Sequence, residues 1–70
     1  MTELNLIAAA IAVFTGVGAG IGIGIATGKA AEATARQPEA SGKIQTMLLL
    51  GAALAEATAI YGLVIAFLVM

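Results

Sequence analysis

Two long runs of this sequence contain almost no charged residue. The first covers residues 4–28, and the second covers residues 44–70, where Glu56 is the only charged side chain. About 20 apolar residues are enough for a helix to cross a hydrocarbon core roughly 30 Å thick. Both runs exceed that length, so each can span a membrane with some tilt or overhang. The chain is therefore expected to be an all-α membrane protein whose two transmembrane helices form an antiparallel hairpin.

Composition excludes most other classes of protein. Of the 70 residues, 61% are hydrophobic and only 10% are charged, and a soluble domain of this size could not bury so much apolar surface. The chain has no cysteine and no histidine, so neither a disulfide scaffold nor a zinc site is expected, and we predict no metal or other cofactor. A net charge of −1 leaves no basic surface for nucleic acid.

The residues between the two runs indicate how the hairpin turns. Glu32 precedes Arg36 by four residues in a sequence that favours helix, so the first helix is expected to continue to about residue 36. Pro38 favours an extended Gln37 and suits the first turn of a new helix, and Ser41-Gly42 is a second place where that helix could begin. We therefore predict a single domain, residues 1–70, with transmembrane helix 1 over 4–28, a polar loop over 37–43 and transmembrane helix 2 over 44–70.

The distribution of basic residues predicts the orientation of the hairpin. Lys29, Arg36 and Lys43 all lie near or in the connecting segment, and neither end of the chain carries a basic side chain. By the positive-inside rule, the loop is expected in the cytoplasm and both termini on the outer side. The first run is too long for a signal peptide and follows the acidic Glu3, so we expect it to remain in the mature protein.

Glycines alternate along the first predicted helix. They form two ridges with small residues four positions apart, on nearly opposite sides of the helix. Two close-packing faces suit a helix that has copies of itself on both sides, and head-to-tail contacts of that kind can close into a ring. The alternative is that the small residues only pack helix 1 against helix 2 and one further neighbour. The ridges contain Gly16, Gly20, Gly24 and Gly28 on one side, and Gly18, Gly22, Ala26 and Ala30 on the other.

Glu56 lies in the middle of the second run, roughly 18 to 21 Å from either end of the predicted helix. An ionised carboxylate is costly at that depth, and no lysine or arginine of this chain reaches it. The side chain must therefore be protonated, bind a cation or meet a positive charge on another protein. An ionisable group inside a membrane marks a functional site, although a structural acid that is hydrogen-bonded to a neighbour is the alternative.

Two hydroxyl side chains follow Glu56 on the same predicted helix. Tyr61 is too deep to anchor at the membrane surface, so we expect its hydroxyl to form a hydrogen bond with Glu56. Thr58 either supports Glu56 or bonds to its own backbone, as threonines in membrane helices often do. Alanines and glycines surround the acid and leave room for close helix contacts.

Together these features resemble the c subunits of the F-type ATP synthases, the family of proteolipids that forms the rotating ring of the membrane sector, F0. The resemblance rests on the alternating glycines, the loop sequence from Ala35 to Glu39 (ARQPE) and the segment from Ala53 to Tyr61 (ALAEATAIY) around the single acid. It implies a ring of identical subunits in a bacterial plasma membrane, in contact with lipid, with helix 1 lining the inside. The loop residues Arg36, Gln37, Pro38 and Glu39 would contact the central stalk subunits gamma and epsilon.

The resemblance also implies a mechanism. Glu56 would accept a proton, pass the lipid in its neutral form and release the proton beside an arginine of the stator subunit a. The chain would thus have no catalytic residue of its own and would act as a component of a rotary ATP synthase. A small pore-forming membrane oligomer and a structural proteolipid are alternatives from other classes of function, but neither requires an isolated acid at the middle of the membrane.

The ion carried by Glu56 is expected to be a proton rather than sodium. A sodium ion needs several oxygen ligands, and the sodium-type members resembled by this sequence have a glutamine on helix 1 and a hydroxyl residue directly after the acid. Those positions match Ile23 and Ala57, neither of which has a side-chain oxygen. Since Thr58 and Tyr61 retain part of that pattern, a sodium-carrying ring remains the alternative.

Overall fold

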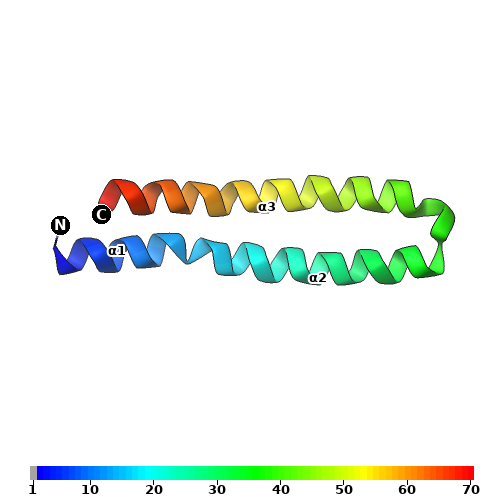
Figure 1. The fold of residues 1–70 in the computed structure, drawn as a ribbon, viewed down its shortest axis with the longest axis horizontal. Coiled ribbons are helices and arrows are strands. Elements are labelled where there is room, and N and C mark those ends of the chain that lie inside the picture. The colour runs from blue at the N-terminus through cyan, green and yellow to red at the C-terminus, as the bar shows by residue number, and fades with distance from the viewer. Residues whose placement is uncertain (1) are drawn as a thin grey trace.

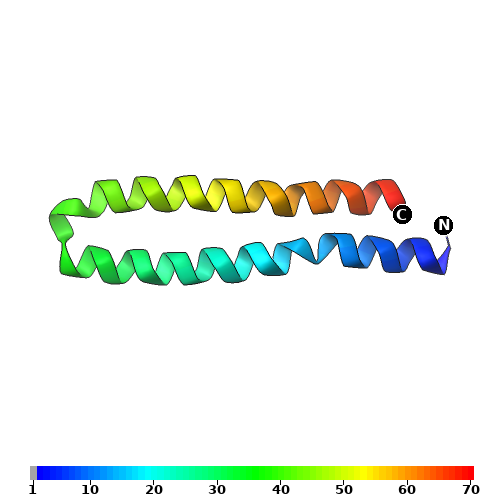
Figure 2. The same cartoon turned by 180° about the vertical axis from the view of Figure 1, so that it is seen from behind.

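The computed structural model describes residues 2–70 as two long helical arms that run antiparallel and are joined by a short connection (Figure 1). Helices α1 (Glu3–Val13) and α2 (Thr15–Arg36) form the first arm, and α3 (Ser41–Val69) forms the second. A single 3-10 turn, η1 (Pro38–Ala40), lies in the connection. Figures 1 and 2 show both termini at the end of the hairpin opposite this connection. The expected all-α hairpin is confirmed.

Both arms are long and apolar enough to cross a membrane. The candidate spans cover Glu3–Arg36 and Pro38–Val69, and their most apolar 18-residue windows have mean hydropathies of 2.2 and 2.0. In their most apolar windows only 6% and 11% of the residues are buried within the hairpin, so these helices do not form the core of a soluble domain. The hairpin measures 55 Å along its longest axis, which exceeds a hydrocarbon core of roughly 30 Å and allows the connection to extend beyond it.

Small side chains form the contact between the arms. Most residues with reduced exposure recur at intervals of three, four or seven positions, the spacing of one helix face that packs along another. Alanine allows the two backbones to approach closely, as in other membrane helix pairs. On the first arm this face includes Ala9, Ala12, Ala19, Ile23 and Ala30, and on α3 it includes Ile44, Leu48, Ala52, Ala55, Ala59, Gly62 and Ala66.

The first arm is interrupted at Phe14, whereas the sequence predicted one helix from 4 to about 36. The Phe14 N–H donates to the Ile11 carbonyl at 3.2 Å, and the Val17 N–H donates to the Phe14 carbonyl at 3.0 Å. These bonds span three residues instead of four and tighten the helix locally. The Thr15 hydroxyl donates to the Ala12 carbonyl at 3.2 Å, a side-chain bond of the kind that bends helices.

The connection is shorter than the loop predicted over 37–43. Helix α2 ends at Arg36, and the Gln37 N–H donates to the Ala33 carbonyl at 2.9 Å. Gln37 has φ −135° and ψ 73°, which directs the chain out of the helix, and Pro38 then begins η1. Helix α3 starts at Ser41, the second of the two starts considered from the sequence and three residues before the transmembrane run at 44, because Pro38 has the φ angle of a first helical turn and the next residues continue it.

The glycines of the first arm are not needed for the contact with α3. A methyl group added at any of the six would meet no atom of another residue within 4 Å, apart from its own helix and chain neighbours. The packing of the hairpin therefore does not explain why these positions are glycine. The six residues are Gly16, Gly18, Gly20, Gly22, Gly24 and Gly28.

Candidate functional site

Glu56 lies near the middle of α3, fifteen residues after Ser41 and thirteen before Val69. At 1.5 Å per residue these separations are about 22 and 20 Å. The carboxylate is therefore near the midplane of any membrane that the hairpin spans symmetrically. Its side chain is exposed on the surface of the hairpin, where in a membrane it would face lipid or another protein.

The register between the arms sets the residues beside Glu56. Ile23 lines a groove of about 200 Å³ together with Ala52 and Ala55 of α3. The arms are antiparallel, so moving one helical turn from this groove toward the termini leads from Ile23 to Ala19 on α2 and from Ala52 to Glu56 on α3. Ala19 and Glu56 therefore lie at the same height along the hairpin. The acid thus lies beside the glycine-rich part of α2, where small residues allow another helix to approach closely.

Glu56 projects from one edge of the hairpin. It directly follows Ala55, a residue of the face that contacts the first arm, and so lies about 100° around α3 from that residue. On α2, Gly20 directly follows the contact residue Ala19 and turns to the same edge of the antiparallel pair. We call this edge the Glu56 flank, with Gly20, Gly24 and Glu56 as its members.

Thr58 and Tyr61 project from the opposite edge. Each directly precedes a residue of the contact face, Ala59 or Gly62, and therefore lies about 100° around α3 in the other direction. We call this edge the Tyr61 flank, with Gly18, Gly22, Thr58 and Tyr61 as its members. Within the hairpin, Tyr61 is 69% exposed, and the Thr58 hydroxyl donates to the Ala55 carbonyl at 2.7 Å. The fold of one copy separates these hydroxyls from Glu56.

The two residues that match sodium-site positions lie apart from any oxygen-rich cluster. Ile23 is half-buried in the apolar groove against α3, and Ala57 is half-buried on α3. Among the residues that the structure describes, 2–70, no group of three or more His, Cys, Asp or Glu side chains could hold a metal ion. The side chains of one hairpin therefore supply only Glu56 as a charged group at this depth.

The predicted stalk-contacting residues lie together at the tip of the hairpin. Arg36 ends α2, Gln37 forms the link, and Pro38 and Glu39 begin η1. All four are exposed at the end remote from both termini (Figure 1). The short bonded turn holds these side chains in one small area, which suits a contact surface for another protein.

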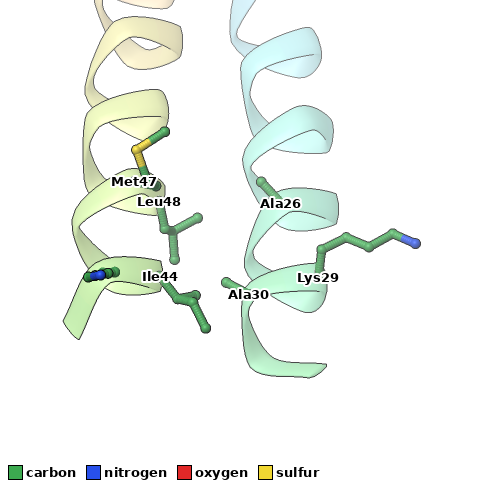
Figure 3. Close-up of a pocket in the computed structure, with 7 residues that line it drawn as sticks. Ala26, Lys29, Ala30, Ile44, Met47 and Leu48 are labelled. Atoms are coloured by element: carbon green, nitrogen blue, oxygen red, sulfur yellow. The ribbon is translucent and has the colours of Figure 1, made fainter. Parts of the chain in front are cut away.

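An apolar groove opens between the arms close to this tip. Figure 3 shows Ala30 and Ile44 directed toward one another across it, while the Lys29 side chain extends away from α3. Both lysines of the groove lie on the same edge as the Tyr61 flank, since each directly precedes a residue of the contact face. The lining consists of Ala26, Lys29, Ala30, Lys43, Ile44, Met47 and Leu48.

The fold and the site together define a class of protein. It is a membrane-spanning helical hairpin with one acid at half height, small residues on both flanks and a polar tip that carries most of its charges. Such a chain is suited to carry an ion within an assembly of copies.

Comparison with known proteins identifies the family. The family model of the ATP synthase C subunit matches residues 7–69. The ATP synthase c subunit of Ruminiclostridium cellulolyticum is 71% identical over 69 residues, which cover 99% of this chain and 91% of the relative. The ATP synthase c subunit of Clostridium botulinum is 72% identical over 68 residues, which cover 97% and 96%, and that of Caldanaerobacter subterraneus is 70% identical over 69 residues, which cover 96% and 94%.

The chain belongs to the family of ATP synthase c subunits. Members of this family are two-helix hairpins that assemble into the membrane rotor ring, and the fold described above is such a hairpin. The chain is therefore a membrane component of an ATP synthase complex that takes part in ion transport. The resemblance inferred from the sequence is confirmed.

Sequence reasoning missed one contact of the site region. Gly62 is one of the small residues noted around Glu56, but its contact with Thr15 at the interruption of the first arm was not predicted. A signal was present, because Gly62 directly follows Tyr61 and lies outside the alternating glycines. The pairing itself requires the antiparallel register, which the sequence does not contain.

Proposed function

We propose that this chain is the proton-carrying rotor subunit of its ATP synthase, and that Glu56 is the group that is reversibly protonated. The observation that supports this most strongly is the position of Glu56. It is the single charged residue of the second transmembrane run, lies at half height and is exposed on the hairpin surface. A carboxylate there is stable when it is protonated or when another protein supplies a positive charge.

The proposed cycle alternates between these two states. Glu56 takes up a proton from one side, travels past lipid as a neutral acid and releases the proton next to an arginine of the stator subunit a. Moving one charge through 100 mV is worth about 2.3 kcal/mol, so several protons per turn can drive ATP synthesis in the soluble head. The tip residues Arg36, Gln37, Pro38 and Glu39 transmit the rotation to the stalk subunits gamma and epsilon.

The two flanks suggest how neighbouring copies complete the site. In a ring, copies are related by rotation, so the Glu56 flank of one copy faces the Tyr61 flank of the next. The Thr58 hydroxyl already donates its hydrogen to the Ala55 carbonyl, which leaves its lone pairs to accept from a protonated acid. The Tyr61 hydroxyl of the same neighbour can donate to the carboxyl oxygens. Both expected hydroxyl partners of Glu56 thus come from the adjacent copy.

The proton is favoured over sodium by the same geometry. Ile23 and Ala57 supply no side-chain oxygen, whereas sodium requires several oxygen ligands at once. A proton needs only the carboxylate and one acceptor, and Thr58 of the neighbouring copy is such an acceptor. All three basic residues, Lys29, Arg36 and Lys43, lie toward the tip, which supports an orientation with the connection in the cytoplasm and both termini outside the bacterial plasma membrane.

Carbodiimide labelling of Glu56 in isolated rings tests this proposal. The reagent attacks a protonated carboxyl group, so we expect labelling to decrease as the pH rises, with little change when millimolar sodium is added at neutral pH. The modified position is determined by mass spectrometry of the chain. Labelling at Glu32 or Glu39 instead of Glu56 would contradict the assignment of the ion-carrying group, and strong protection by sodium would overturn the choice of the proton.

A further inference from the structure

Among the nine glycines of the chain, Gly62 is the one at which the two arms approach most closely. A methyl group built at this position would overlap the Thr15 hydroxyl oxygen and would lie 2.5 Å from the carbonyl oxygen of Ala12. The other eight glycines of the chain have nothing within 4 Å of such a group. Since the Ala12 carbonyl belongs to the backbone, it cannot move away as a flexible side chain would. Only glycine fits between α3 and the first arm at this level.

The surface that Gly62 contacts is the interruption at Phe14. The Thr15 hydroxyl donates to the Ala12 carbonyl at 3.2 Å, so the two groups nearest to Gly62 are joined to each other. The hydrogen bonds of Phe14 and Val17 shorten the helix repeat at the same place. The interruption therefore presents one defined shape to α3, and Gly62 is the residue that matches it.

Hydrophobic burial alone does not determine the rotation of α3. This helix is apolar on all sides, and large exposed side chains such as Leu49, Leu54 and Ile60 occur around its circumference. Lipid is as apolar as these side chains, so the hydrophobic effect does not favour the contact of any one face of α3 with the first arm. Shape must therefore select the face that contacts the first arm, and at Gly62 the two arms leave no room for a side chain.

The position of Gly62 links this contact to the ion-carrying site. Gly62 directly follows Tyr61 and comes six residues after Glu56. When Gly62 faces the first arm, Tyr61 lies about 100° to one side and Glu56 about 120° to the other. We propose that the contact of Gly62 with Thr15 and Ala12 fixes the rotation of α3 about its own axis and thereby positions Glu56 and Tyr61 on opposite flanks. This inference rests on the proposed function, in which adjacent copies meet flank to flank.

The rotation of α3 can be measured with introduced thiols, independently of activity. The chain has no cysteine of its own, so only the introduced thiols react. Leu63 follows Gly62 on the side of the Glu56 flank, and Ile65 precedes Ala66 on the side of the Tyr61 flank. In the double variant Leu63→Cys and Ile65→Cys, a short bifunctional thiol reagent should join adjacent copies of assembled rings into multimers. The rate of multimer formation is measured by gel electrophoresis.

Adding Gly62→Ala to this double variant should slow the formation of multimers. A displacement of about 1 Å can cost up to 10²-fold in a reaction that depends on position, and we expect a decrease of at least about tenfold. The carbodiimide labelling rate of Glu56 should change in the same rings. Gly42→Ala is the matched control, since it makes the same change in α3 where the added methyl group meets nothing within 4 Å.

The outcomes separate this inference from the function on which it rests. If the parent double variant forms multimers and Gly62→Ala leaves both rates unchanged, the positioning role is refuted while the rotor function stands. If the parent forms no multimers, the flank-to-flank arrangement is refuted, and this inference with it. Should Gly62→Ala fail to assemble, Thr15→Ala removes the contact without a clash, and an unchanged multimer rate in that variant would equally refute the proposal.

Discussion

Replacing Glu56 by glutamine is expected to abolish both proton pumping and proton-driven ATP synthesis, with rates falling to background. Glutamine has nearly the same size and can form hydrogen bonds, so the hairpin and the ring should still assemble. It cannot release a proton, however, and each charge that no longer moves through 100 mV removes about 2.3 kcal/mol of driving energy. Without that charge the ring has no force to turn it.

The measurement uses membrane vesicles that contain the complete ATP synthase. Proton pumping is followed with a pH-sensitive dye after addition of ATP, and ATP synthesis is followed after an imposed proton gradient. Glu3→Gln provides the matched control, because it makes the same chemical change at the terminal end of the hairpin, and both rates should remain near those of the unmodified complex. Normal coupling in the Glu56→Gln vesicles would overturn the rotor assignment in favour of a structural proteolipid.

The second large effect is expected at the alternating glycines. In Gly20→Leu the hairpin itself should fold normally, because the space around Gly20 is open within one copy. The new side chain would instead meet the adjacent copy, where overpacking costs about 1–3 kcal/mol at each contact. Since every copy in a ring repeats the same contact, we expect either no ring or a ring with more subunits.

Native mass spectrometry of the purified ring measures this outcome directly as a change in subunit number. Ile21→Leu is the matched control, because Ile21 is 60% exposed on the same helix and already has a large side chain. Its ring should have the unmodified mass. A Gly20→Leu ring of unchanged mass would show that the glycines do not form the contact between copies.

The structure weakens one alternative explanation of these glycines. Had they served mainly to pack the first arm against α3, added methyl groups would meet atoms of the second arm, just as a methyl group at Gly62 meets atoms of the first arm. Such overlap is absent at all six glycines of the first arm, while alanines and Ile23 form the contact with α3. Close contacts with other molecules are then the remaining physical reason for a series of glycines in a membrane helix, where glycine lowers helix stability by roughly 1 kcal/mol.

The connection between the arms shows which features could be predicted from local backbone preferences. Pro38 and the helix-favouring residues before Arg36 were enough to predict where the first helix ends, because both effects act on the backbone within one turn. The polar loop was placed over 37–43, with Ser41-Gly42 only a second choice for the start of the next helix, and α3 begins at that second choice. Polar side chains are fully compatible with a helix that extends beyond the membrane, so polarity did not indicate the boundary.

The interruption at Phe14 could not be predicted from local backbone preferences. The run from 4 to 28 has no proline, and its apolar character predicts an uninterrupted span. The Thr15 hydroxyl can bond to its own helix at any such position, and only the neighbouring backbone decides whether the helix bends there. In this fold Gly62 leaves room for the displaced Ala12 carbonyl, a contact between residues far apart in the chain.

The sequence by itself determined the membrane class, the two spans, the turn near Pro38 and Glu56 as the candidate ion carrier. These follow from hydropathy, charge positions and backbone preferences, which act locally or through the membrane as solvent. Only the tertiary structure decided which face of each helix meets the other, and hence that Glu56 lies on one flank while Thr58 and Tyr61 lie on the other. Helices that are apolar on every side have no sequence signal for their rotation, because lipid stabilises all their faces equally and only the shape of the partner helix distinguishes them.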